Sequence, residues 1–165
     1  SPRRRSELSL EIKKRSIKWD VVELPPSAID KVVINGRKYH KLNWLEAKAM
    51  ATVISNLHPD IAYVDASDVN TTRFANQIAE LISFKIQIIS EHHADSTYPI
   101  VSAASIIAKV YRDTVIESLH KQFGNFGSGY PSDMKTRQFI AKWIKTKKSL
   151  PDFVRQSWKT VRRLL

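Results

Sequence analysis

The spacing of hydrophobic residues predicts helices and strands in alternation. Apolar residues recur at helical intervals between 42 and 57, and Asn43 can cap that helix. They are Leu42, Leu45, Ala49, Val53 and Leu57. A continuous apolar run over 61–64 has the length of a buried parallel strand. A helical stripe follows over 74–81 and a second strand over 84–90. This order predicts an α/β domain with parallel strands.

The sequence before this core is less regular. Ser1 and Pro2 have the pattern of a helix cap and a first-turn proline, so a short basic helix is expected to open the chain. The apolar-rich stretch 19–24 stops at two prolines, which predicts a strand. The following stretch, 26–41, is expected to be irregular, with one turn at Gly36.

Three amphipathic helices are predicted in the C-terminal half, over 101–123, 135–147 and 152–165. In the first of them, apolar residues form one stripe and polar residues fall on another face. The polar face comprises Ser102, Ser105, Lys109 and Arg112. The expected organisation is an α/β core over 1–124, followed by a loop and a helical C-terminal part over 125–165 in the same domain.

Composition narrows the class of protein. The 165 residues carry a formal net charge of +11, and 42% of them are hydrophobic, which is ordinary for a globular domain. The charge favours a polyanionic partner such as nucleic acid, and a lysine-rich solvated surface is the alternative. The absence of cysteine excludes disulfides, thiolate metal sites and cysteine nucleophiles. No apolar run approaches the roughly 18 residues of a membrane span and no signal peptide is recognisable, so we expect a soluble, cytoplasmic protein.

Two aspartates follow the predicted strands. Asp65 comes directly after the first strand, and Asp95 lies one strand–helix–strand unit further on. Because ligands of parallel sheets bind beyond the carboxyl ends of the strands, these carboxylates are expected to lie close together. Mg²⁺ uses one or two carboxylates, water and substrate phosphates, and two such ions can flank a scissile phosphate. The alternative is that both aspartates cap helices, and two carboxylates are too few for a usual two-metal site.

Two further elements contain residues suited to a phosphate backbone. On the helix 101–123, Lys109 and Arg112 can donate to phosphates, or else they belong to a solvated face. The loop 127–133 contains two glycines, which allow close approach of the backbone to a ligand. Its Tyr130 offers a ring for stacking and a hydroxyl that can sense a 2′-OH, unless it packs in a simple turn between helices.

Several segments resemble, in the same order, the archaeal form of ribonuclease HII. The central one reads Tyr-Pro-Ile-Val-Ser-Ala-Ala-Ser-Ile-Ile-Ala-Lys-Val-Tyr-Arg-Asp over 98–113. It is followed by Gly-Ser-Gly-Tyr-Pro-Ser-Asp over 127–133. The segments 63–69, 93–95 and 153–160 also match that family. The resemblance covers most of the chain.

The resemblance implies a ribonuclease H-like mixed sheet flanked by helices. It also implies an endonuclease that cleaves the RNA strand of RNA–DNA hybrids and cuts 5′ of ribonucleotides embedded in DNA. The family uses two-metal-ion hydrolysis, with Mg²⁺ or Mn²⁺ held by four carboxylates. Two of these catalytic, metal-binding carboxylates are placed on Asp65 and Asp95. The substrate-binding residues implied are Tyr130, Gly129, Ser128, Lys109, Arg112 and Arg155.

The family's other two carboxylates belong to an Asp-Glu-x-Gly-Arg-Gly motif on its first strand, and this sequence does not contain that motif. We therefore expect a chain that lacks the first strands and leaves a sheet edge exposed. One hypothesis is the larger part of a monomeric enzyme that acts on RNA–DNA hybrids or on DNA duplexes with embedded ribonucleotides. The alternative is a non-catalytic nucleic-acid-binding fragment, because half of the metal ligands are absent.

Overall fold

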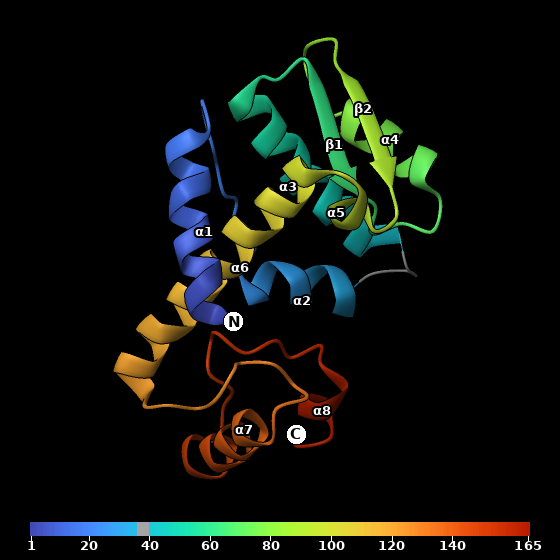
Figure 1. Cartoon of the computed structure of the whole chain (residues 1–165). Helices are drawn as coiled ribbons and strands as arrows, with labels where there is room; N and C mark the ends of the chain where they lie inside the picture. Colours follow the sequence, from blue (N-terminus) through green and yellow to red (C-terminus); the bar gives the residue numbers. More distant parts are fainter. Residues whose placement is uncertain (36–39) are drawn as a thin grey trace. The chain divides into compact units, whose positions relative to one another are not determined.

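The computed structural model describes residues 1–35 and 40–165. Figure 1 labels the helices and strands, which are α1 (Pro2–Arg15), α2 (Pro26–Ile34), α3 (His40–Leu57), β1 (Ile61–Asp65), α4 (Thr71–Ala79), β2 (Gln87–Glu91), α5 (Ala94–Thr97), α6 (Pro99–Phe123), α7 (Met134–Lys147) and α8 (Lys159–Arg162). Their contacts divide the chain into two units. Unit 1 consists of Ser1–Glu23 with Tyr39–Arg112, and unit 2 of Leu24–Lys38 with Asp113–Leu165.

The sheet of unit 1 consists of β1 and β2, which run parallel and side by side (Figure 1). The α/β class and the parallel strand pair predicted from the sequence are confirmed. The register pairs Asp65 with Glu91, so both strands end at the same edge. β1 buries Ala62 and Val64, whereas Ile61 remains 43% exposed. The strand is therefore half-buried and not covered on both faces as its apolar run predicted.

Helices α3 and α4 supply most of the core of unit 1. The buried residues are Ala47, Ala51, Ile54, Ala62, Val64, Phe74, Ile78 and Ile82. On α3 the most deeply buried residues are Ala47 and Ala51, which are not part of the predicted stripe. These small side chains face the core. Asn43 lies inside α3, which begins at His40, so it is not the cap that was predicted. Asn70 caps α4, since its side chain accepts the N–H of Arg73 at 2.9 Å where this helix begins.

Unit 2 has a core of its own around α7 and α8. Its buried residues are Ile140, Val154 and Val161, against which Phe139, Ile144, Leu150, Phe153 and Trp158 pack. Helix α2 is tied to this unit by Asp30, whose carboxylate accepts the backbone N–H groups of Gln156 at 2.8 Å and Ser157 at 2.9 Å. Burial acts to raise the pKa of Asp30, but the hydrogen bonds from Ser157 and Gln156 bring this pKa below its ordinary value.

The segment before α3 corrects two predictions. Residues 19–24 form no strand. Asp20 accepts a hydrogen bond from the side chain of Asn56 at 2.7 Å. Residues 26–34 are helical and not irregular as predicted, since α2 begins at Pro26, where proline suits the first helical position. The turn expected at Gly36 lies outside the described residues.

The C-terminal segment 152–165 is not the continuous helix that was predicted, because only α8 within it is helical. The backbone N–H groups of Gln156 and Ser157 bind Asp30 in place of a preceding helical turn. A helix therefore cannot extend through them. Val154 and Val161 are nevertheless buried, as their apolar spacing predicted.

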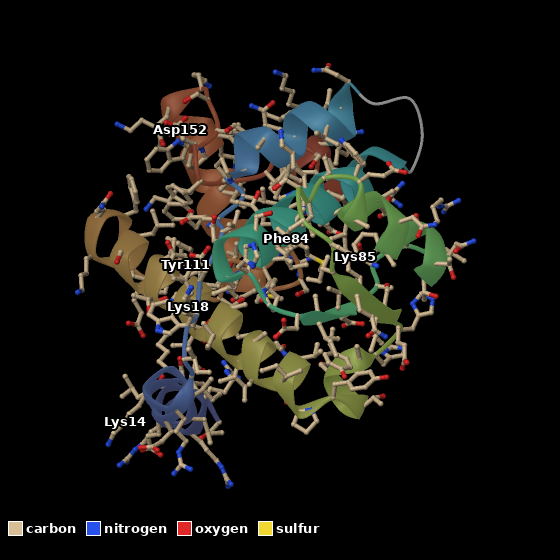
Figure 2. All side chains as sticks on the ribbon, turned by 90° about the horizontal axis from the view of Figure 1, so that it is seen from above. Lys14, Lys18, Phe84, Lys85, Tyr111 and Asp152 are labelled. Carbon is tan, nitrogen blue, oxygen red and sulfur yellow. The ribbon has the colours of Figure 1, made fainter. Side chains whose placement is uncertain are left out.

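The outer surface of α1 is strongly polar and mostly basic. Figure 2 shows Lys14 on the outward side of this helix, where several nitrogen-tipped side chains gather. Arg3 and Arg15 pair with glutamates one turn away, with N···O distances of 3.1 and 3.4 Å. Within residues 1–35 and 40–165, no helix combines the length and the apolar character needed to cross a membrane.

Candidate active site

The carboxyl ends of β1 and β2 bring two of the predicted site residues onto adjoining segments. Asp65 ends β1, and its Oδ1 accepts a hydrogen bond from the backbone N–H of Ala94 at 3.3 Å. Ala94 begins α5, whose first turn contains Asp95. Asp65 is exposed and Asp95 is half-buried. Both carboxylates therefore lie at one edge of the sheet.

A third carboxylate at this edge, Glu91, was missed from the sequence. The hydroxyl of Tyr98 donates to Oε1 of Glu91 at 2.6 Å, and this hydrogen bond raises the pKa of Tyr98. Because Glu91 precedes α5 and Tyr98 follows it, their contact fixes both ends of the short helix that carries Asp95. The parallel register places Glu91 opposite Asp65, and the sequence alone does not give this register.

The loop that follows Asp65 is held by an ion pair between the buried carboxylate of Asp68 and the partly exposed Arg73. Asp68 is 1% exposed. Its carboxylate accepts the backbone N–H of Asn70 at 2.9 Å and Nε of Arg73 at 3.0 Å, and Nη2 of Arg73 also contacts Oδ1. The hydrogen bond from Arg73, followed by the one from Asn70, lowers the pKa of Asp68 to about 2. The carboxylate thus stays charged and joins the end of β1 to the first turn of α4.

Helix α6 places its two predicted phosphate-binding cations in unit 1, together with both aspartates. Lys109 is exposed and Arg112 is half-buried. On the same helix, the hydroxyl of Tyr111 donates to Oε2 of Glu23 at 3.1 Å. Ser102 and Ser105 are also half-buried, so the polar face of α6 is only partly solvated.

The remaining predicted substrate-binding residues, Ser128, Gly129, Tyr130 and Arg155, belong to unit 2. Tyr130 is 49% exposed. Gly129 has a φ of +72°, a left-handed conformation that favours glycine. Arg155 is half-buried and does not lie on a helix; its Nη2 is 3.3 Å from Oγ of Ser157.

The aspartate pair offers carboxylate oxygens to a divalent metal. Among residues 1–35 and 40–165, no three histidine, aspartate or glutamate side chains are grouped as metal ligands. Asp65 uses only one of the roughly four acceptor positions of a carboxylate for Ala94. Mg²⁺ is commonly held by one or two carboxylates with water and substrate phosphates. The pair therefore fits an open Mg²⁺ or Mn²⁺ site but does not enclose one.

Comparison with known proteins identifies the family. The model of the ribonuclease HII family matches residues 1–161. The chain belongs to the ribonuclease HII family. Ribonuclease HII of Methanosarcina barkeri is 45% identical over 173 residues, which cover 99% of this chain and 75% of that protein. Ribonuclease HII of Methanoregula boonei is 47% identical over 165 residues, which cover 100% of this chain and 75% of that protein.

Solved structures of ribonuclease HII relatives have the same fold. The ribonuclease H2 of Pyrococcus horikoshii superposes with a TM-score of 0.88 at 37% identity, covering 99% of this chain and 76% of that one. The Archaeoglobus fulgidus ribonuclease HII, solved in a complex with PCNA, gives a TM-score of 0.84 at 40% identity with the same coverage. The chain is thus a member of a family of hydrolases.

The depressed pKa values of two carboxylates predict that this ribonuclease HII chain loses stability in acid. Both Asp68 and Asp133 have pKa values of about 2, below the ordinary 3.8. For Asp133 the first cause is the hydrogen bond from the backbone N–H of Ser128. Because the folded pKa values are depressed, their contribution to stability is complete above the unfolded value and is lost as pH falls from about 4 to 2.

Urea unfolding measured at intervals from pH 6 to pH 2 checks this expectation. The free energy of unfolding should fall most steeply below pH 4, and Asp68→Asn combined with Asp133→Asn should flatten that fall. An equally steep fall in the double variant would contradict the assignment to these two carboxylates.

Proposed function

We propose that this protein is an endonuclease that cleaves the RNA strand of RNA–DNA hybrids and cuts 5′ of ribonucleotides embedded in DNA. The observation that carries the proposal is the hydrogen bond from Ala94 to Asp65, which sets Asp65 and Asp95 on adjoining segments at the carboxyl edge of the sheet. Family membership supports the reaction class. We further propose a cytoplasmic monomer.

In this proposal Asp65 and Asp95 ligate Mg²⁺ or Mn²⁺ as catalytic residues. When bound, two such ions would activate water and stabilise the leaving oxygen of the scissile phosphate. The family places two additional carboxylates on an Asp-Glu-x-Gly-Arg-Gly strand that the printed sequence does not contain. Glu91 and Tyr98 would orient the Asp95 helix, since their 2.6 Å hydrogen bond spans it.

The cations and the glycine-containing loop would hold the nucleic acid. Lys109, Arg112 and Arg155 would donate to backbone phosphates, which fix the register of a duplex without reading its sequence. Tyr130, with Ser128 and Gly129 beside it, would contact the ribonucleotide and sense its 2′-OH. The net charge of +11 supports such a partner, because displaced counterions favour binding.

Cleavage of matched duplexes tests the proposal. The full-length protein with Mg²⁺ should cut a duplex with one embedded ribonucleotide on the 5′ side of that residue, and it should leave the all-DNA duplex of the same sequence intact. Mapping the product ends by denaturing electrophoresis identifies the cut. Cutting of both duplexes alike, or a cut elsewhere, would contradict it.

A non-catalytic nucleic-acid-binding role is the second candidate. It is favoured by the lack of any group of three metal-ligating side chains within residues 1–35 and 40–165. This role predicts duplex binding with a steep salt dependence and no cleavage at any Mg²⁺ or Mn²⁺ concentration. The same two duplexes therefore separate the candidates, with binding measured by fluorescence anisotropy at several salt concentrations.

A further inference from the structure

One buried hydroxyl holds the loop that leads to Tyr130. Thr136, on α7, is 3% exposed. Its Oγ1 accepts a hydrogen bond from the backbone N–H of Gly129 at 3.1 Å and donates one to the backbone O of Phe126 at 3.0 Å. Thr136 thus fixes both ends of the segment that comes directly before Tyr130.

Other side chains bind the backbone between those two ends. His120, in the last turn of α6, has its Nε2 2.8 Å from the backbone O of Gly127. Asp133, which caps α7, accepts the backbone N–H of Ser128 at 2.7 Å. Asn125 accepts the N–H of Gly127 at 3.0 Å. Hydrogen bonds therefore determine the path of this loop residue by residue.

Packing restricts the same loop further. Gly127 has a φ of +91°, and a Cβ added there would lie 2.5 Å from Oδ2 of Asp133. Phe126 is 2% exposed and packs with its ring centroid 4.5 Å from His120 and 5.2 Å from Phe139. Tyr130 lies only a few residues beyond this anchored base, yet it is 49% exposed. The loop is thus a fixed support for an exposed tyrosine.

We infer that Thr136 and His120 are positioning residues that set the conformation of the loop and present Tyr130 to the ribonucleotide. The inference rests on the proposed function, in which Tyr130 contacts the substrate. If the loop is already ordered before the substrate binds, no free energy is spent on ordering it during binding. More of the favourable free energy of the Tyr130 contact then contributes to affinity. Thr136 and His120 act through Tyr130 and touch no reacting atom.

Paired substitutions at Thr136 test its hydroxyl. Thr136→Val keeps the branched shape and removes the hydroxyl, whereas Thr136→Ser keeps the hydroxyl. In the full-length protein, T136V is expected to lower kcat/KM for the single-ribonucleotide duplex by about 2- to 10-fold, through KM, because the loop must then be ordered on binding. T136S is expected to stay near the wild-type value.

A second pair at His120 keeps the test decisive if T136V fails to fold. His120→Phe retains a ring against Phe126 but has no donor for the backbone O of Gly127, whereas His120→Gln retains an N–H donor. H120F should raise KM and H120Q should restore it. Thermal unfolding of all four variants identifies any that are not folded.

A cycle with Tyr130→Ala separates positioning from a general structural effect. If Thr136 acts through Tyr130, T136V should have no further effect on KM in the Y130A background. The inference would be overturned if the effects of T136V and Y130A on KM multiplied in the double variant. It would also be overturned if KM were unchanged in both T136V and H120F. Failure of the wild-type protein to cut this duplex would instead overturn the proposed function.

Discussion

Asp95→Asn is expected to lower Mg²⁺-dependent cleavage of a single-ribonucleotide duplex by more than about 100-fold. Loss of a residue that only supports a metal ligand already costs about 10- to 100-fold, so loss of a ligand itself should cost more. The substitution keeps the volume and the polarity of the side chain and removes its charge. Asp95 lies in the first turn of α5, where it is half-buried and next to the residue that binds Asp65.

The matched control for this substitution is Asp60→Asn. Asp60 is exposed and precedes β1 at the end of the strand opposite Asp65, so its loss should leave cleavage within about twofold of the wild type. Calorimetric titration with Mg²⁺ gives a second measurement, in which D95N should bind more weakly and D60N as the wild type does. Near-normal cleavage by D95N would refute the assignment of the metal site.

Asp68→Ala is expected to lower the free energy of unfolding by about 2–3 kcal/mol. Removing a buried hydrogen-bond partner costs about 1–3 kcal/mol, and breaking a fully buried ion pair about 3–5 kcal/mol. The lower range applies because the side chain of Arg73 is 44% exposed and can be hydrated once its partner is gone. The loss should appear in urea unfolding at neutral pH.

A second substitution at Asp68 separates the hydrogen bond from the charge, and a substitution at an exposed ion pair is the control. Asp68→Asn retains an acceptor for the N–H of Asn70 but loses the charge that pairs with Arg73, so it should cost less than D68A. Glu7→Ala breaks an exposed ion pair between Arg3, whose side chain is 89% exposed, and Glu7, whose side chain is 62% exposed. It should change the free energy of unfolding by less than about 1 kcal/mol. A D68A variant as stable as E7A would contradict the stabilising role of the ion pair between Asp68 and Arg73.

The α/β core of unit 1 could be predicted from local patterns because each of its elements carries its own signal. The apolar run before Asp65 and the stripe on α4 need no knowledge of distant residues. In unit 2 the signals are not local. Helix α2 begins at the second of the two prolines that end the predicted strand, because proline also suits the first turn of a helix. Asp30 binds the backbone of Ser157, and no periodicity reports such a contact.

The candidate site shows the same difference. Asp65 and Asp95 could be selected because strand ends and spacing mark them. Glu91 could not be selected without the register of the strands, which pairs it with Asp65. The roles of Thr136 and His120 could not be predicted at all, since they bind backbone atoms of Gly129, Phe126 and Gly127 and leave no pattern of residue types.

The hydrogen bonds of Asp30 have a consequence for the order in which the chain folds. Asp30 and Ser157 are 127 residues apart in sequence, so closing this contact orders a very long loop. At a synthesis rate of about 5–20 residues per second, α2 leaves the ribosome roughly 6–25 s before its partner segment exists. Strands β1 and β2, joined through α4, have no such delay. During synthesis, the carboxylate of Asp30 therefore remains hydrated and without these partners until residues 156 and 157 exist, and unit 2 is completed last.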